Sequence, residues 1–172
     1  MTEPRRAAVL VALHREGDGE AVVLTRRAEH LPTHAGQIAF PGGRHDVGRD
    51  ESLLATALRE AHEEIGLDPR HVEILGALPA VTTMSSAFEI HPFVGRIPPH
   101  YPFQPHAGEV VEVFSMPLRA YADPALRVSH PWSVGGHAVE VPAIAYDGRL
   151  VWGATLRILD LLHDSPLGSH ES

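Results

Sequence analysis

Three glutamates, Glu60, Glu63 and Glu64, lie within five consecutive positions of the chain. Their spacing of i, i+3 and i+4 places the three carboxylates on one face of a helix, where like charges repel one another. Many acidic clusters of this kind are solvated surface, but a bound divalent cation also relieves the repulsion. Mg²⁺ and Mn²⁺ prefer oxygen ligands, and Mg²⁺ sites commonly include substrate phosphates. The cluster therefore predicts a metal site that acts on a phosphorylated compound.

A helix over residues 50–65 is expected to position this cluster. Apolar residues recur there at helical spacing, namely Leu54, Leu58, Ala61 and Ile65. Such a stripe docks one side of a helix on a core and leaves the acidic residues on its side or back. Asp50, Glu51 and Ser52 provide N-cap and first-turn chemistry, and Gly66 provides a stop signal. Before the helix, residues 40–43 (Phe-Pro-Gly-Gly) form a turn whose glycines allow close backbone approach.

From Gly43 to Leu67 the residues resemble the Nudix box, G-x5-E-x7-R-E-U-x-E-E-x-G-U, in which U is apolar. The stretch 59–67 reads Arg-Glu-Ala-His-Glu-Glu-Ile-Gly-Leu and matches every defined position of the second half. Seven residues separate Gly43 from Glu51, where the family pattern has five. Two additional loop residues cost little, because the entropy of loop closure grows slowly with length. They leave open whether Glu51 or Asp50 takes the role of the loop glutamate.

The resemblance implies an α/β fold, the Nudix α/β/α sandwich with a mixed β-sheet between helices. It also implies that Glu60, Glu63 and Glu64 bind Mg²⁺ or Mn²⁺ during hydrolysis of a pyrophosphate bond, with Glu63 acting in catalysis. Arg59 is expected to orient these carboxylates through a forked ion pair. Glu51 is expected either to contact the metal-binding carboxylates without binding the metal itself, or to assist deprotonation of the attacking water.

A second stretch, residues 23–43, resembles the extra signature of the coenzyme A pyrophosphatase branch, L-L-T-x-R-[SA]-x3-R-x3-G-x3-F-P-G-G. Val23 replaces the first leucine, and Pro32 stands where the pattern has an arginine, so one candidate phosphate-binding charge is missing. Residues 151–155 (Val-Trp-Gly-Ala-Thr) also resemble this branch. Arg27, Gly42 and Gly43 are expected to bind substrate, although a strand-end arginine that faces water is the alternative for Arg27.

The general base of Nudix enzymes can lie outside the box. Residues 109–114 resemble the region that supplies it, and of the two glutamates there, Glu109 and Glu112, we expect Glu109 to be the base. A solvated carboxylate at a helix start is the alternative.

Three functions remain open at this stage. The first is hydrolysis of coenzyme A or its thioesters to 4′-phosphopantetheine (or its acyl form) and adenosine 3′,5′-bisphosphate. The second is cleavage of another nucleoside diphosphate linked to some group, such as ADP-ribose, NADH or a dinucleoside polyphosphate. The third, a non-catalytic nucleotide-binding module, is least favoured because such modules usually lose box carboxylates.

Length and composition limit the number of domains, the kinds of metal site and the kinds of partner. A chain of 172 residues fits one domain (1–172, with an ordered core over about 5–164). It contains no cysteine, which excludes disulfides and thiolate metal sites. The net charge of −8 argues against a nucleic acid polymer as partner. No segment reaches the length of a membrane span, so we expect a cytoplasmic enzyme that binds a small nucleotide substrate. A homodimer is one option for its oligomeric state.

Strands are expected at residues 7–14, 21–26, 37–40, 72–78, 88–97, 126–130 and 137–145, from their apolar and β-branched runs. A proline-rich loop is expected over 97–107, a short helix near 118–122 and a last helix over 152–163.

Overall fold

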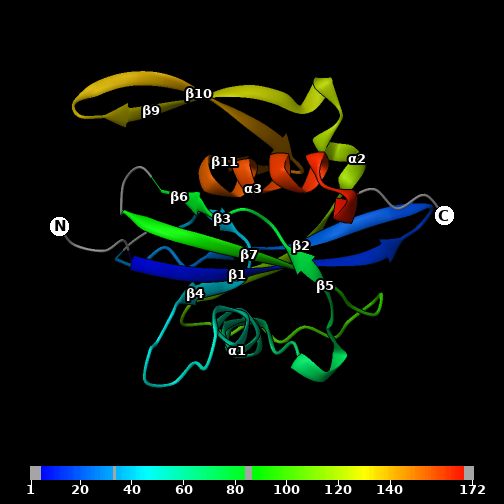
Figure 1. Cartoon of the computed structure of the whole chain (residues 1–172). Coiled ribbons are helices and arrows are strands. Elements are labelled where there is room, and N and C mark those ends of the chain that lie inside the picture. Colours follow the sequence, from blue (N-terminus) through cyan, green and yellow to red (C-terminus); the bar gives the residue numbers. More distant parts are fainter. Residues whose placement is uncertain (1–4, 33, 84–86, 169–172) are drawn as a thin grey trace.

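A mixed β-sheet forms the middle layer of the protein, between helix α1 (Leu53–Ile65) on one face and helix α3 (Gly153–Asp164) on the other (Figure 1). The computed structural model of the chain describes residues 5–32, 34–83 and 87–168. The predicted α/β/α sandwich is confirmed. No helix in the described part of the chain is both long and apolar enough to cross a membrane.

The main sheet follows the order β3-β2-β1-β7-β5, with β4 paired to β1, β6 to β7 and β8 to β2. Its strands are β1 (Arg5–Glu16), β2 (Gly19–Arg27), β3 (Ile38–Ala39), β4 (Gly42–Arg44), β5 (Glu73–Ala77), β6 (Val81–Thr82), β7 (Phe88–Arg96) and β8 (Val110–Pro117). A second sheet follows the order β11-β10-β9, and its strands are β9 (Arg127–Val134), β10 (His137–Tyr146) and β11 (Arg149–Trp152). A short helix α2 (Leu118–Tyr121) connects the two sheets.

Strand β1 is the centre of the main sheet, and it pairs antiparallel with β2 and parallel with β7. Its apolar run is buried on both faces, as is typical of a strand covered by helices on each side. Alternate residues serve two cores. Ala8, Leu10 and Ala12 belong to the core under α1, whereas Val11 and Leu13 belong to the core on the side of α3.

The first helix begins later than the sequence predicts. Ser52 is its N-cap, and its hydroxyl accepts a hydrogen bond from the backbone N–H of Ala55 at 3.0 Å. The predicted start at Asp50 is wrong, because the Asp50 side chain turns inward to other partners. The predicted stop is confirmed, since Gly66 caps the helix at φ 70°. Strands β4, β6, β8 and β11 are not among the strands that the sequence predicted.

Candidate active site

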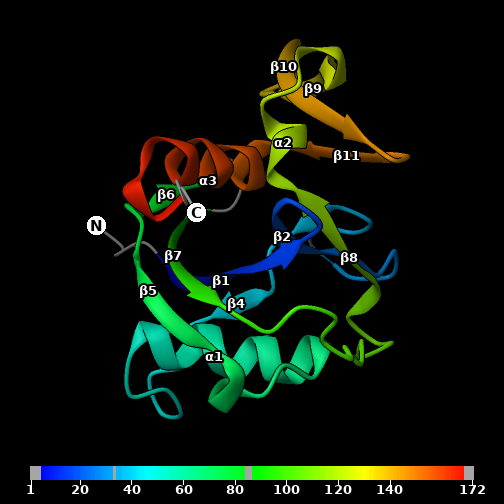
Figure 2. The same cartoon turned by 90° about the vertical axis from the view of Figure 1, so that its right-hand side faces the viewer.

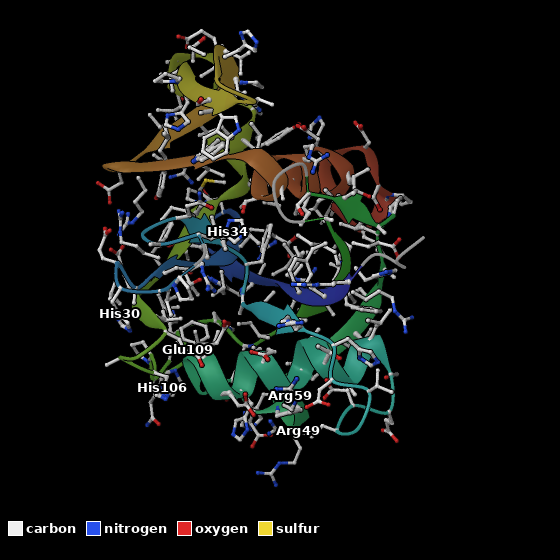
Figure 3. The ribbon with its side chains drawn as sticks, turned by 90° about the vertical axis from the view of Figure 1, so that its left-hand side faces the viewer. His30, His34, Arg49, Arg59, His106 and Glu109 are labelled. Atoms are coloured by element: carbon white, nitrogen blue, oxygen red, sulfur yellow. The ribbon has the colours of Figure 1, made fainter. Side chains whose placement is uncertain are left out.

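One carboxylate oxygen from each of Glu60, Glu64 and Glu109 lies within 4.8 Å of the other two. Glu60 and Glu64 project from α1, whereas Glu109 comes from the segment that leads into β8. Figure 3 shows Glu109 beside α1. Glu64 is only 3% exposed, Glu60 is half-buried and Glu109 is exposed. Three carboxylates gathered at a partly open site provide the hard oxygen ligands that Mg²⁺ and Mn²⁺ prefer, so this group fits a divalent ion.

Backbone hydrogen bonds hold Glu109 against the helix. The N–H of His106 donates to the carbonyl of Glu64 at 2.7 Å, and the N–H of Glu109 donates to the carbonyl of His106 at 2.9 Å. On the other side, the N–H of Ala28 donates to the carbonyl of Glu109 at 2.9 Å. The proline-rich loop thus connects the end of α1 to β2 and places Glu109 opposite Glu64.

The two glycines before the helix let the acidic side chains approach the sheet closely. The N–H of Gly42 donates to Oε2 of Glu64 at 3.1 Å. A Cβ at position 42 would lie 2.3 Å from the carbonyl oxygen of Ala8, and one at position 43 would lie 2.6 Å from Cδ of Glu60. Any larger residue would displace these groups. The expected contact of Gly42 and Gly43 with phosphate stays a prediction. In the structure, the N–H of Gly42 binds the carboxylate of Glu64.

Arg59 forms a two-pronged ion pair with Asp50. Its Nε and Nη2 donate to the two carboxylate oxygens at 2.7 and 2.9 Å. Asp50 is buried and also accepts hydrogen bonds from the hydroxyl of Thr56 and the N–H of Asp46, each at 2.9 Å. The hydrogen bonds from Arg59 hold the pKa of Asp50 well below its usual range, and in turn Asp50 raises the pKa of Arg59.

The longer loop of this chain explains why Asp50 is in this place. The N–H groups of Arg49 and Asp50 both donate to the carbonyl of Asp46, at 3.0 and 2.7 Å, so that the loop closes on itself. This turn brings Asp50 to Arg59 and leaves Glu51 exposed to solvent. Of the two residues that the sequence left open, Asp50 therefore contacts the arginine of the box, and the expected catalytic role of Glu51 stays untested.

Glu63 points toward arginines and is not part of the acidic group. Its two oxygens accept from Nη2 of Arg49 at 2.7 Å and from Nη1 of Arg59 at 3.2 Å. The same Nη1 of Arg59 also donates to Glu60 at 3.0 Å. Arg59 therefore contacts Glu60, Glu63 and Asp50 together, whereas the expected role of Glu63 as a metal ligand requires its release from Arg49.

Arg27 ends β2 close to the acidic group, and its positive charge lowers the pKa of Glu64. Its Nε is buried without a hydrogen-bond partner among the described residues, and a buried donor of this kind is available to a ligand. The neighbouring Arg26 lies 3.6 Å from Glu112, which also pairs with Arg149. Glu112 is thus held by two arginines, and Glu109 is the carboxylate of this segment that joins the acidic group.

Burial raises the pKa of Glu64 to about 8, and the charges of Glu60 and Glu109 act in the same direction. Burial also raises the pKa of Glu60. A buried carboxylic acid that retains its proton near neutral pH, as Glu64 does, loses that proton when a cation binds.

We expect the metal-free protein to lose stability as pH rises. Because the folded-state pKa of Glu64 lies above its ordinary value of 4.5, its stabilising contribution is complete below pH 4.5 and is lost as pH rises through about 8. Melting temperatures measured in EDTA between pH 5 and pH 9 should therefore decline, and Mn²⁺ should raise them most at the alkaline end. A Glu64→Gln variant should show a flatter profile. An identical decline in both proteins would contradict the assignment.

Comparison with known proteins identifies the family of this chain. Residues 4–132 match the model of the NUDIX domain family. The curated relative "Uncharacterized Nudix hydrolase NudL" of Enterobacter sp. (strain 638) is 44% identical over 159 residues, covering 90% of this chain and 79% of the relative.

Solved structures show the same fold. A MutT/nudix family protein from Enterococcus faecalis aligns with a TM-score of 0.63 at 17% identity, over 95% of this chain and 62% of that protein. The NUDIX domain of Shewanella oneidensis NrtR, solved with ADP ribose, aligns with a TM-score of 0.52 at 22% identity, over 69% of this chain and 76% of that domain.

Proteins of this family bind small nucleotide substrates and generally use divalent metal ions. Because the family match spans most of the chain and includes both α1 and Glu109, this chain belongs to the Nudix family and is a pyrophosphohydrolase.

Proposed function

We propose that this enzyme hydrolyses the pyrophosphate bond of coenzyme A or its thioesters, giving 4′-phosphopantetheine (or its acyl form) and adenosine 3′,5′-bisphosphate. The observation that carries the proposal is the position of Arg27. This arginine belongs to the stretch that resembles the coenzyme A signature, it lies near Glu64, and its Nε is buried and unpaired. A diphosphate beside the acidic group would provide the missing acceptor.

In the proposed site, Glu60, Glu63 and Glu64 would hold Mg²⁺ or Mn²⁺, with Glu63 released from Arg49, and Glu109 would lie beside them without binding the ion. When bound there, such an ion would supply positive charge that neutralises phosphate oxygens and would lower the pKa of a water molecule. Arg59 is fixed by Asp50, so it keeps Glu60 and Glu63 in position. The protein's main contribution is therefore placement and charge.

Glu109 is the proposed general base, because it is the most exposed member of the acidic group and comes from outside the helix. It takes a proton from the attacking water as the new P–O bond forms. The P–O bond to the bridging oxygen breaks, and that oxygen leaves with the electron pair on the departing phosphate.

Pro32 favours a second candidate substrate. It stands where the coenzyme A signature has an arginine, so one expected phosphate contact is absent. Another nucleoside diphosphate linked to a second group, such as ADP-ribose, NADH or a dinucleoside polyphosphate, would not need that charge. This alternative keeps the same acidic group and the same chemistry.

The test is a substrate panel of coenzyme A, ADP-ribose, NADH and a diadenosine polyphosphate, each with Mg²⁺ or Mn²⁺ and with EDTA as the blank, and with products identified by mass spectrometry. Release of adenosine 3′,5′-bisphosphate well ahead of the other products supports the first proposal. Cleavage of another compound with coenzyme A intact supports the second.

We expect Arg27→Ala to raise KM for the preferred substrate about tenfold with a smaller change in kcat, because a contact made equally in ground and transition states acts on binding. Arg27→Lys should recover part of the affinity. Arg26→Ala is the matched control, since Arg26 is directed to Glu112. Steady-state kinetics separate the two parameters, and equal KM values for Arg27→Ala and the parent enzyme would remove Arg27 from the substrate site.

A further inference from the structure

The hairpin of β9 and β10 projects from the body of the protein. Figures 1 and 2 show it extending past α3, away from the main sheet and α1. Gly135 and Gly136 form its turn, with φ values of 57° and 82° that suit glycine. Among the described residues, this arm has two faces and two free edges, one along β9 and one along residues 137–142 of β10, where β11 does not pair. Each is a potential contact surface.

One face of this hairpin is largely apolar, with six apolar residues and two histidines. Residues directly opposite one another in an antiparallel pair share a face, and the register places on one face the pairs Val128↔Ala143, His130↔Val141, Trp132↔Val139 and Val134↔His137. Three of its valines are largely open to solvent: Val128 is 41% exposed, Val134 38% and Val139 40%. We call this surface the valine face.

Aromatic rings pack against one another at the base of the valine face. Trp152 of β11 lies opposite Ala143, so it continues the same face. Its ring is 4.7 Å from that of Trp132 and 4.6 Å from that of His130, measured between centroids. Aromatic pairs at this separation attract one another beyond the area that they bury. The face is thus a formed surface rather than scattered apolar residues.

The two free edges of the hairpin are less suited to contact than the face. Pro131 of β9 and Pro142 of β10 are both exposed, and proline cannot donate a hydrogen bond to an added strand. A partner should therefore pack on the valine face and not extend the sheet.

We propose that the partner is a second copy of this chain, with the valine faces of two hairpins packed on each other in a two-fold symmetric dimer. The chain carries a net charge of −8, so two copies repel one another overall. The valine face holds no Asp, Glu, Lys or Arg, whereas the opposite face of the hairpin holds Glu140 and Arg127. Self-packing of an uncharged apolar face avoids that repulsion, and a two-fold interface requires this kind of self-complementary surface.

The size of the surface sets the expected affinity. An eight-residue strand is about 27 Å long. One face of a two-stranded hairpin of that length buries less surface than the ~800 Å² per partner of a standard interface. The dimer should therefore have a dissociation constant in the micromolar range and depend on protein concentration.

Sedimentation velocity over about 1–200 µM brackets such an equilibrium. The parent protein should pass from monomer to dimer, and Val139→Glu, which places a charge in the valine face, should weaken association at least about tenfold. Ala138→Glu is the matched control, because Ala138 is the adjacent exposed residue and faces the other side. A parent protein that stays monomeric at every concentration would overturn the proposal, as would equal weakening by both variants.

A second measurement does not require the protein to fold with a glutamate at position 139. The chain contains no cysteine, so a single introduced thiol has no other thiol in its own chain with which to pair. Under mild oxidation, Val139→Cys should form a disulfide-linked dimer much faster than Ala138→Cys does. Equal rates at the two positions would show that the valine face does not meet its copy.

Discussion

Glutamine in place of Glu64 will lower metal-dependent turnover by about 10³-fold or more, equivalent to about 4 kcal/mol of transition-state stabilisation. Glu64 is the buried member of the acidic group and lies within reach of both Glu60 and Glu109. The amide removes one negative charge and places a neutral group where the ion needs a carboxylate. Initial rates with the preferred substrate at saturating Mn²⁺ measure the loss.

Glu64→Gln should not unfold the protein. The substitution keeps the shape of the side chain, and it removes a carboxylate whose burial raises its pKa to about 8, so the apo protein should melt at an equal or higher temperature near neutral pH. Glu73→Gln, which changes an exposed glutamate on β5, is the control for loss of charge. A Glu64→Gln enzyme that keeps more than about a tenth of parental turnover would contradict a metal-binding role.

The layers of the fold follow from the sequence because their signals are local. The apolar stripe of α1 and the continuous apolar run of β1 each fix an element without reference to the rest of the chain. Strands β4 and β11 lack such signals, since they contain three and four residues and owe their form to the strands that they pair with. The expectation of a single domain over residues 1–172 stays a prediction.

The candidate site also contains residues whose positions the sequence predicts and residues whose positions it does not. The positions of Glu60 and Glu64 follow from helix geometry, but the place of Glu109 depends on the proline-rich loop and on pairing between β2 and β8. Sequence alone named Glu109 as a base and could not place it among the helix carboxylates. It also left Glu51 and Asp50 unresolved, because a two-residue change in loop length shifts which side chain reaches Arg59. That choice depends on how the loop over residues 46–50 closes.

Asparagine in place of Asp50 will destabilise the protein by about 3 kcal/mol or more, within the range for breaking one partner of a buried ion pair. Asp50 is buried and accepts both prongs of Arg59. In Asp50→Asn the side chain at position 50 is neutral, so the half-buried guanidinium of Arg59 loses its charged partner there and keeps only weaker acceptors at that position. Chemical denaturation monitored by fluorescence of Trp132 and Trp152 measures the change.

The matched variant is Glu51→Gln, which alters the adjacent carboxylate. Glu51 is exposed, so its loss should change the free energy of unfolding by no more than about 0.5 kcal/mol. Equal effects of the two variants would show that Asp50 has no special role.

The pH dependence of this ion pair provides an independent check. The pKa of Asp50 is lowered by Arg59, so its stabilising contribution is present above the ordinary value of 3.8 and is lost as pH falls through the lower folded-state pKa. The stability gap between the parent protein and Asp50→Asn should therefore stay constant from neutral pH down to about pH 5 and close only in stronger acid. A gap that closed near pH 6 would contradict control of the Asp50 carboxylate by Arg59. Arg59 also contacts Glu60 and Glu63. We therefore expect kcat to fall in Asp50→Asn even under conditions where the protein remains folded. Such a fall would show that the turn over residues 46–50, which places Asp50, also helps to place the acidic side chains of α1.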